Sequence, residues 1–132
     1  FEDAIAAEES RLAGTEEALP ADRHHLSHSH QHHAYLSRGR YVVHLRRLEQ
    51  ILGRDRIHVV DSHRLFSDPE EHTEGVLRFL GLEPVAGMQF ERHNARSRSP
   101  MSAELQDRLR EHYAPWDEEL TRWLGWSPSW CQ

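Results

Sequence analysis

The second half of the chain contains a cluster of basic residues whose side chains are of the kind that bind phosphate groups. Four basic or potentially basic residues lie within seven positions: Arg92, His93, Arg96 and Arg98. On a chain with a formal net charge of −6, such a cluster indicates a local anion site rather than general attraction to polyanions. Ser97 and Ser99 alternate with the arginines, and Ser99-Pro100 stands where a helix could begin. Arginine side chains, hydroxyl groups and the free N–H groups at the start of a helix all bind phosphate. These residues therefore indicate a phosphate site, and the alternative interpretation is a solvated basic loop.

Histidines form a second cluster, whose chemistry would be metal binding. The cluster consists of His24, His25, His28, His30, His32 and His33. His28 is four positions from His24 and from His32, so a helix would place these three imidazoles on one face, as metal ligands often are. No cysteine joins the run, and histidine-rich tracts often bind metals weakly without using them. The sequence therefore favours a solvated loop and assigns no metal site. A separate hypothesis is that the histidines become protonated near pH 6, so that the loop attracts an anionic substrate.

Composition indicates one domain, or part of one, with a modest core. The chain has 132 residues, of which 37% are hydrophobic. The lone cysteine, Cys131, excludes an internal disulfide. No run of eighteen apolar residues occurs, and residues 1–20 are acidic and alanine-rich, unlike a signal peptide. These features predict a cytoplasmic protein without a membrane span, and the absence of an initial Met suggests that Phe1 is not the natural start.

Apolar spacing and capping residues predict about five helices. The predicted helices cover residues 1–13, 37–52, 68–80, 102–113 and 116–124. The buried stripe of the second helix is expected at Tyr41, Leu45, Leu48 and Leu52. Asp68 before Pro69 is typical of an N-cap, and Gly81 of the residue that follows a helix end, with Leu82 placed for the accompanying contact. Residues 20–34 are predicted to form a His-rich loop, and residues 88–101 a basic loop.

One segment near residues 56–60 has the composition of a buried parallel strand. It is β-branched and apolar on both faces apart from His58, which is typical of a strand inside a sheet covered by helices. A single strand cannot satisfy its two hydrogen-bonding edges, and no second strand pattern occurs. The sequence therefore predicts an α/β protein whose strand pairs with a segment outside these 132 residues.

An ordered set of segments resembles the second half of the sulfotransferases, most of all the bacterial enzymes and the sulfotransferase domains of the heparan sulfate group. These segments are Phe1–Ile5, Tyr35–Tyr41, Ile57–Val60, Leu65–Pro69, Val76–Leu82, Tyr113–Leu120 and Ser129-Trp130. Each is weakly specific alone, but their order along nearly the whole chain is fairly specific. Asp68-Pro69 followed by Phe79-Leu80-Gly81-Leu82 carries the most weight.

The resemblance implies a P-loop-like α/β fold, with a parallel sheet flanked by helices. Residues 1–132 would be the mostly helical C-terminal portion of a single sulfotransferase domain. Such enzymes transfer a sulfuryl group from 3′-phosphoadenosine 5′-phosphosulfate to a hydroxyl or amine and require no metal. By resemblance, Arg96, Ser97 and Arg98 correspond to the late basic loop that closes over the nucleotide and contacts its 3′-phosphate.

Three parts of the family pattern are missing from the 132 residues. No Gly-rich loop for the 5′-phosphosulfate occurs, and the Arg…Ser pair that holds the 3′-phosphate in the family is missing too. No residue matches the catalytic base, which is therefore left unassigned. The chain alone is expected to be inactive and to need an upstream half of the same protein, or a partner chain, together with a small-molecule or carbohydrate acceptor. No nucleic-acid motif occurs. The alternative hypothesis is a noncatalytic module of the same origin that binds an anion, a nucleotide or a metal.

Overall fold

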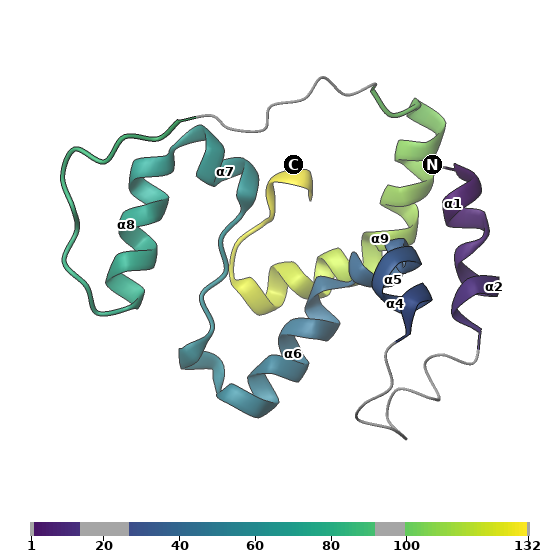
Figure 1. The fold of residues 1–132 in the computed structure, drawn as a ribbon, viewed down its shortest axis with the longest axis horizontal. Helices are drawn as coiled ribbons and strands as arrows, with labels where there is room; N and C mark the ends of the chain where they lie inside the picture. The colour runs from purple at the N-terminus through teal and green to yellow at the C-terminus, as the bar shows by residue number, and fades with distance from the viewer. Residues whose placement is uncertain (1, 14–26, 92–99, 132) are drawn as a thin grey trace.

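The computed structural model describes residues 2–13, 27–91 and 100–131, in which the chain is helical (Figure 1). The α-helices are α1 (Glu2–Ala6), α2 (Glu8–Leu12), α4 (His28–His33), α5 (Tyr35–Arg38), α6 (Tyr41–Leu52), α7 (Ser62–Ser67), α8 (Pro69–Phe79) and α9 (Ala103–Leu124). Two 3-10 turns, η1 (Arg54–Arg56) and η2 (Ser129–Cys131), complete the described part. The expected total of about five helices is too low, since α4 lies within the predicted loop 20–34 and α7 was not anticipated.

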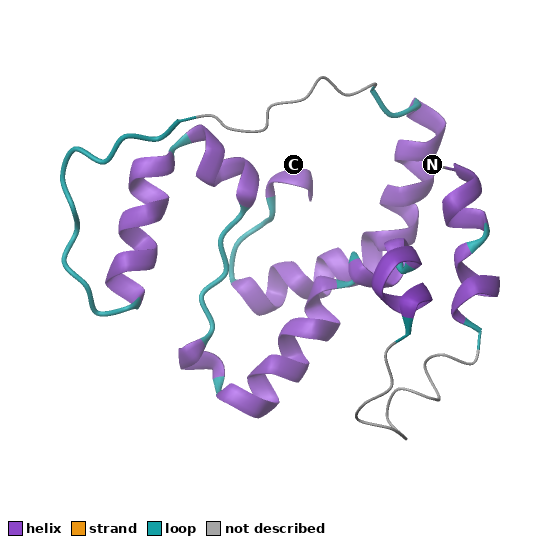
Figure 2. Cartoon of the chain, in the orientation of Figure 1, coloured by secondary structure: helices purple, strands orange, loops and turns teal. Residues whose placement is uncertain are grey.

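The predicted α/β fold is wrong for the described residues, which contain no strand (Figure 2). Ile57 does have extended backbone angles, with φ −118° and ψ 115°. Its N–H, however, donates to the Arg54 carbonyl oxygen at 3.2 Å, inside the preceding turn. A β-branched apolar stretch becomes a strand only when a second chain segment lies alongside it, and the described ranges supply none.

The centre of the molecule is the packing of α6 against α9 (Figure 1). Five apolar side chains are buried in the described residues: Ala34, Val42, Leu105, Leu120 and Pro128. Polar contacts reinforce the same interface. The Trp123 indole N–H donates to Glu49 at 2.6 Å, and the Arg46 guanidinium lies 2.5 Å from the Glu119 carboxylate. The core is small, as the hydrophobic share of the sequence predicted.

The buried face of α6 differs from the predicted stripe. Tyr41, Leu48 and Leu52 are 50%, 43% and 44% exposed, whereas Val42 is fully buried. The spacing of apolar residues indicates which side chains share a face, but it does not indicate which face the next helix will cover. Here α9 covers the neighbouring face, and much of the predicted stripe is left at the surface.

Helix α9 is continuous where two helices were predicted. Ser102 caps its start by accepting a hydrogen bond from the Leu105 N–H at 3.3 Å, and Pro115 lies inside it. Proline has no N–H to donate to the carbonyl of residue 111, so it disturbs a helix locally without having to end it. The ribbon of α9 changes direction between its two halves (Figure 1). No helix in the described ranges is long and apolar enough to cross a membrane.

Helices α7 and α8 pack against each other and extend away from the α6–α9 pair (Figure 1). The predicted start of α8 is confirmed, because the Asp68 carboxylate accepts a hydrogen bond from the Glu71 N–H at 3.2 Å. Its predicted end is confirmed as well. Gly81 has a φ of +71°, and the Leu82 N–H donates to the Leu77 carbonyl oxygen at 2.9 Å, which together form the expected left-handed stop.

Candidate functional site

A cleft in the described part has a volume of about 590 Å³ and an aromatic lining. We call it the aromatic cleft and define it by Tyr35, Tyr41, Tyr113 and Trp130, with Arg38 and Asp117 as its charged residues. These side chains come from α5 and α6 on one side and from α9 and η2 on the other, two regions that are far apart in the sequence. The cleft is therefore a product of tertiary packing.

Two aromatic rings at the edge of the aromatic cleft remain accessible. The ring centroids of Tyr41 and Trp130 are 5.7 Å apart at 54°, and the two side chains are about half exposed. The Trp130 indole N–H donates to Asp117 at 3.2 Å, which holds the indole in place. Exposed rings held by such contacts can stack on a flat or cyclic ligand at little cost in side-chain entropy.

Tyr113 anchors the floor of the aromatic cleft to α5. Its hydroxyl donates to the Leu36 carbonyl oxygen at 3.1 Å. Burial, assisted by the Glu8 carboxylate, raises the pKa of Tyr113, so the hydroxyl keeps its proton and remains a donor. The ring lies against Gly39, where a Cβ atom would come within 2.5 Å of the Tyr113 ring. The close approach of Tyr113, and not the backbone conformation, requires glycine at this position, because a φ of −71° is open to any residue.

Replacement of Gly39 by alanine is expected to destabilise the protein by about 1–3 kcal/mol, because Tyr113 must move and its bond to Leu36 is strained or lost. Urea unfolding followed by circular dichroism measures the change. Gly75→Ala in α8 is the matched control, since a Cβ there meets nothing within 4 Å. The control should gain roughly 0.5–1 kcal/mol from its higher helix propensity. Equal effects of the two variants would contradict the close packing at Gly39.

Glu8 positions the helix that supplies Tyr35 and Arg38. Its carboxylate is buried and accepts hydrogen bonds from the Leu36 N–H at 2.7 Å and the Ser37 N–H at 3.1 Å, at the start of α5. A carboxylate satisfies such N–H groups and matches the positive end of the helix dipole. Nothing in the sequence indicated this role, because Glu8 lies 28 residues before its first partner.

The two arginines around Gly39 differ in their surroundings. Arg38 lines the aromatic cleft, and its guanidinium donates to the Gln31 carbonyl oxygen. Arg40 instead lies over the Trp116 ring, 4.4 Å from its centroid. His112 lies against the same ring. Burial and the nearby Arg40 guanidinium lower the pKa of His112, and the Glu8 carboxylate opposes this shift only in part. Arg38 is thus available to a ligand, whereas Arg40 supports the packing of α6 on α9.

Asp61 ties the C-terminal segment, and with it Trp130, to the rest of the protein. Its buried carboxylate accepts from the His63 N–H at 2.9 Å, and from the Ser129 N–H and hydroxyl at 2.8 and 3.0 Å. Arg64 reinforces the connection by donating to the Ser127 carbonyl oxygen at 2.7 Å and by covering the Trp126 ring. This single carboxylate therefore caps α7 and fixes η2 at once.

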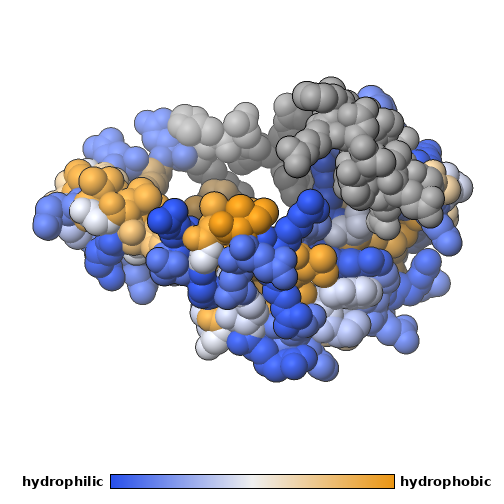
Figure 3. All heavy atoms as spheres, turned by 90° about the horizontal axis from the view of Figure 1, so that it is seen from below, coloured by the Kyte–Doolittle hydropathy of each residue, from blue (hydrophilic) through white to orange (hydrophobic). Residues whose placement is uncertain are grey.

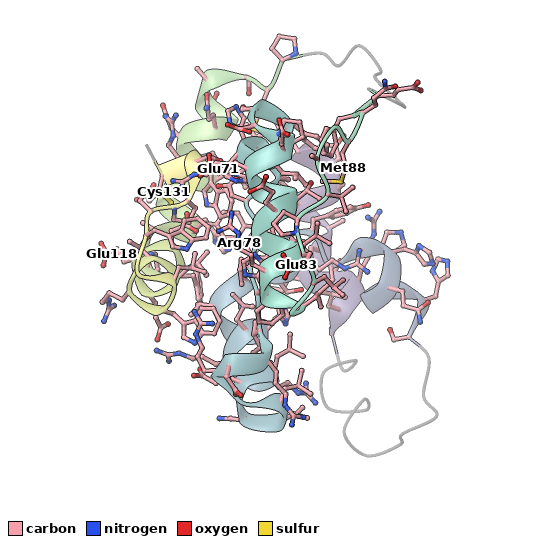
Figure 4. All side chains as sticks on the ribbon, turned by 90° about the vertical axis from the view of Figure 1, so that its left-hand side faces the viewer. Glu71, Arg78, Glu83, Met88, Glu118 and Cys131 are labelled. Carbon is pink, nitrogen blue, oxygen red and sulfur yellow. The ribbon has the colours of Figure 1, made fainter. Side chains whose placement is uncertain are left out.

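A smaller cleft of about 250 Å³ lies beside Asp61. Its lining includes His58, Arg64, His72 and Arg78, together with Glu71. Figure 4 shows Glu71 and Arg78 spaced along α8. Arg78 is already paired with Glu74 at 3.2 Å, and Arg64 is held by the C-terminal segment. These pairings leave the smaller cleft less suited to an anion than its residue types suggest.

The predicted nucleotide-binding residues Arg96, Ser97 and Arg98 lie outside the described residues, as do Arg92 and His93. Their assignment stays a prediction. The structure does bring together other parts of the sulfotransferase resemblance: Tyr35–Tyr41, Tyr113–Leu120 and Ser129-Trp130 all contribute to the aromatic cleft. Tyr41 was predicted to lie in a buried stripe, and neither Trp130 nor Asp117 was predicted to line a site. The terminal run of tryptophans was the available signal for an aromatic surface.

No protein-family model, curated protein or solved structure matches this chain.

Proposed function

We propose that this chain supplies part of the site of a sulfotransferase that uses 3′-phosphoadenosine 5′-phosphosulfate. The observation that carries the proposal is the convergence of three separate segments of the resemblance on the aromatic cleft. Residues 35–41, 113–120 and 130 are distant in the sequence, yet they contribute to one cavity of about 590 Å³. A concave cleft lined by aromatic side chains and a few polar groups is the usual form of a small-molecule site.

The proposed roles divide between nucleotide and acceptor. Arg96, Ser97 and Arg98 bind the 3′-phosphate of the donor through charge-assisted hydrogen bonds. The aromatic cleft holds the hydroxyl- or amine-bearing acceptor against Tyr41 and Trp130. In the reaction, the bond between sulfur and the bridging oxygen breaks, and a bond forms between sulfur and the acceptor oxygen or nitrogen. The proton of the acceptor passes to a catalytic base in the part of the site outside these 132 residues. Negative charge develops on the phosphate oxygen of the leaving adenosine 3′,5′-bisphosphate, where positive donors stabilise it.

A further segment completes the proposed site, either an upstream half of the same protein or a partner chain. The 132 residues contain no Gly-rich loop for the 5′-phosphosulfate. The structure also leaves large apolar side chains uncovered: Phe66 is 83% exposed, Ile51 71% and Leu80 60%. Figure 3 shows apolar surface at the α8 end of the molecule. Uncovered apolar area of this kind favours a protein contact over permanent exposure to water. The lone cysteine fits a cytoplasmic setting for the assembled enzyme.

Two experiments on the complete native polypeptide test the proposal. The first is calorimetric titration with adenosine 3′,5′-bisphosphate, which is the product nucleotide. The second is an assay of sulfuryl transfer to a panel of alcohols, phenols, sugars and amines. Adenosine 5′-monophosphate is the matched ligand, because it lacks only the 3′-phosphate. We expect the bisphosphate to bind at least about tenfold more tightly, the effect of one charge-assisted contact. Equal affinity for the two nucleotides would refute the assignment. Selective binding without transfer to any acceptor would instead identify the noncatalytic nucleotide-binding module.

A further inference from the structure

The aromatic cleft is a largely apolar hollow. Besides its four aromatic residues, it is lined by the aliphatic side chains of Ile5, Leu36 and Leu109. Its volume of about 590 Å³ lies within the range of roughly 300–1,000 Å³ that is usual for small-molecule sites. A polar group of a ligand that loses water in such a cleft without finding a partner costs free energy. A ligand that fits the cleft is therefore mostly apolar.

Most polar groups at the aromatic cleft are already bound to other groups of the protein. The Tyr113 hydroxyl donates to a backbone carbonyl oxygen of α5 at 3.1 Å, and the Trp130 indole N–H donates to Asp117 at 3.2 Å. The Cys131 thiol interacts with the same carboxylate. Arg38 gives one N–H to a carbonyl oxygen of α4, and a guanidinium has several further N–H groups. Arg38 is thus a donor for one oxygen atom of a ligand, whereas a sugar brings several hydroxyl groups for which the cleft has few partners.

The two accessible rings of the aromatic cleft favour an aromatic ligand over an aliphatic one. The centroids of Tyr41 and Trp130 are 5.7 Å apart, and the ring planes are inclined at 54°. A flat ring that lies on the face of one of them therefore meets the other at an angle. Aromatic pairs are favourable both as offset stacks and as edge-to-face contacts, whereas a saturated ring gains only from the burial of its surface.

We propose that the acceptor is a phenol, a flat and largely apolar aryl compound with a single hydroxyl group. The aryl ring lies against Tyr41 and Trp130, and Arg38 is the donor for the hydroxyl oxygen. In the transfer this oxygen forms the bond to sulfur, the bond between sulfur and the bridging phosphate oxygen breaks, and the phenolic proton passes to the base outside these 132 residues. The inference rests on the proposed function for the transfer step, but binding of the ring needs no nucleotide.

The test is calorimetric titration of the complete native polypeptide, without nucleotide, with 2-naphthol, decahydro-2-naphthol and methyl β-D-glucoside. The two naphthalene derivatives share a carbon skeleton and one hydroxyl group, but only 2-naphthol is aromatic, and the saturated alcohol is the more hydrophobic of the two. We expect 2-naphthol to bind at least about tenfold more tightly than decahydro-2-naphthol, which is the effect of two aromatic contacts. The glucoside should bind most weakly. Equal or tighter binding of the saturated alcohol or of the glucoside would overturn the inference.

Replacement of Trp130 by leucine is expected to weaken the binding of 2-naphthol by about tenfold and that of decahydro-2-naphthol much less. Phe66→Leu is the matched control, because Phe66 is 83% exposed on α7 and does not line the aromatic cleft. The control should stay within about twofold of the unmodified chain. Equal losses for the aromatic and the saturated ligand in the Trp130 variant would show that the ring does not stack on Trp130.

A second measurement, on the unmodified chain, does not depend on the folding of a variant. As 2-naphthol is added, the indole N–H resonance of Trp130 must shift in the NMR spectrum. That of Trp123, which is bound to Glu49 between α6 and α9, should stay in place. The reverse pattern would mean that the ligand binds elsewhere and that the inference is wrong.

Failure of this inference is distinguishable from failure of the proposed function. Selective binding of the bisphosphate without a preference for the aromatic ligand would refute the phenol acceptor alone. A preference for the aromatic ligand without selectivity for the bisphosphate would confirm the aryl site and refute the sulfuryl transfer.

Discussion

Replacement of both Arg96 and Arg98 by alanine is expected to raise the KM for 3′-phosphoadenosine 5′-phosphosulfate at least about 100-fold in the complete enzyme. Each arginine is proposed to donate a charge-assisted hydrogen bond to the 3′-phosphate, and such bonds contribute roughly 1.5–3 kcal/mol. The loss of two therefore corresponds to at least about 3 kcal/mol of donor binding. The acceptor KM should change much less, because the proposed acceptor contacts lie in the aromatic cleft. Initial rates over a range of donor and acceptor concentrations measure both constants.

The matched control for this variant is the double substitution Arg108→Ala and Arg110→Ala. These arginines have the same spacing, are exposed on α9, and give the same change in net charge. Arg110 pairs only with Asp107, at 3.4 Å, within the described contacts. A donor KM that stays within about twofold for the control would exclude a general loss of positive charge as the cause. An unchanged donor KM in the Arg96 and Arg98 variant would show that the nucleotide is bound elsewhere.

Replacement of Asp61 by alanine is expected to cost about 2–4 kcal/mol of folding free energy, the largest stability effect that we predict for a single side chain. Loss of the α7 cap costs about 1 kcal/mol, and the Ser129 N–H left without its acceptor costs roughly 1–3 kcal/mol more. Asp68→Ala is the matched control, because Asp68 is exposed and caps α8 through one bond to the Glu71 N–H. The control should cost only about 1 kcal/mol. Urea unfolding at neutral pH compares the two variants, and equal costs would show that the contacts to Ser129 add nothing.

The same carboxylate predicts a loss of stability in acid. Burial raises the pKa of Asp61, but hydrogen bonds from the Ser129 N–H and hydroxyl, and from the Arg64 and His63 N–H groups, outweigh it and leave the pKa lowered. A lowered pKa in the folded state means that this contribution is fully present above about pH 4 and is lost as the pH falls through the folded-state pKa. Asp61→Asn cannot titrate, so its stability should fall less steeply below about pH 4. Parallel acid curves for the two proteins would contradict this role.

Helix ends in this protein could be predicted because they depend on neighbouring residues. Asp68 and Pro69 start α8, and Gly81 and Leu82 end it, as expected from their order in the sequence. A cap is satisfied by N–H or carbonyl groups within four residues, so the necessary partners are always nearby. The same reasoning identified the apolar content of α6, but not the side of α6 that α9 would cover.

The features that could not be predicted depend on partners distant in the sequence. Glu8 caps α5 from another helix, and Asp61 joins α7 to Ser129, which is 68 positions away. The segment at Ile57–Val60 has the composition of a strand, yet it remains unpaired in the described part. Residues 102–113 and 116–124 were predicted to form two helices, whereas one continuous helix covers both ranges and includes Pro115. In each case the structure depended on which segments lay beside the residue, and the local sequence does not indicate them.

By itself the sequence determined that α6, α8 and both halves of α9 are helical, where α8 starts and ends, and which residues carry the sulfotransferase resemblance. Only the tertiary structure decided that Tyr35, Tyr41, Tyr113 and Trp130 share one cleft, and that Gly39 is needed for the approach of Tyr113. The physical reason is the range of the interactions. Capping and helix propensity act over a few residues, whereas a cleft requires close packing of side chains whose separation along the chain says nothing about their distance in space.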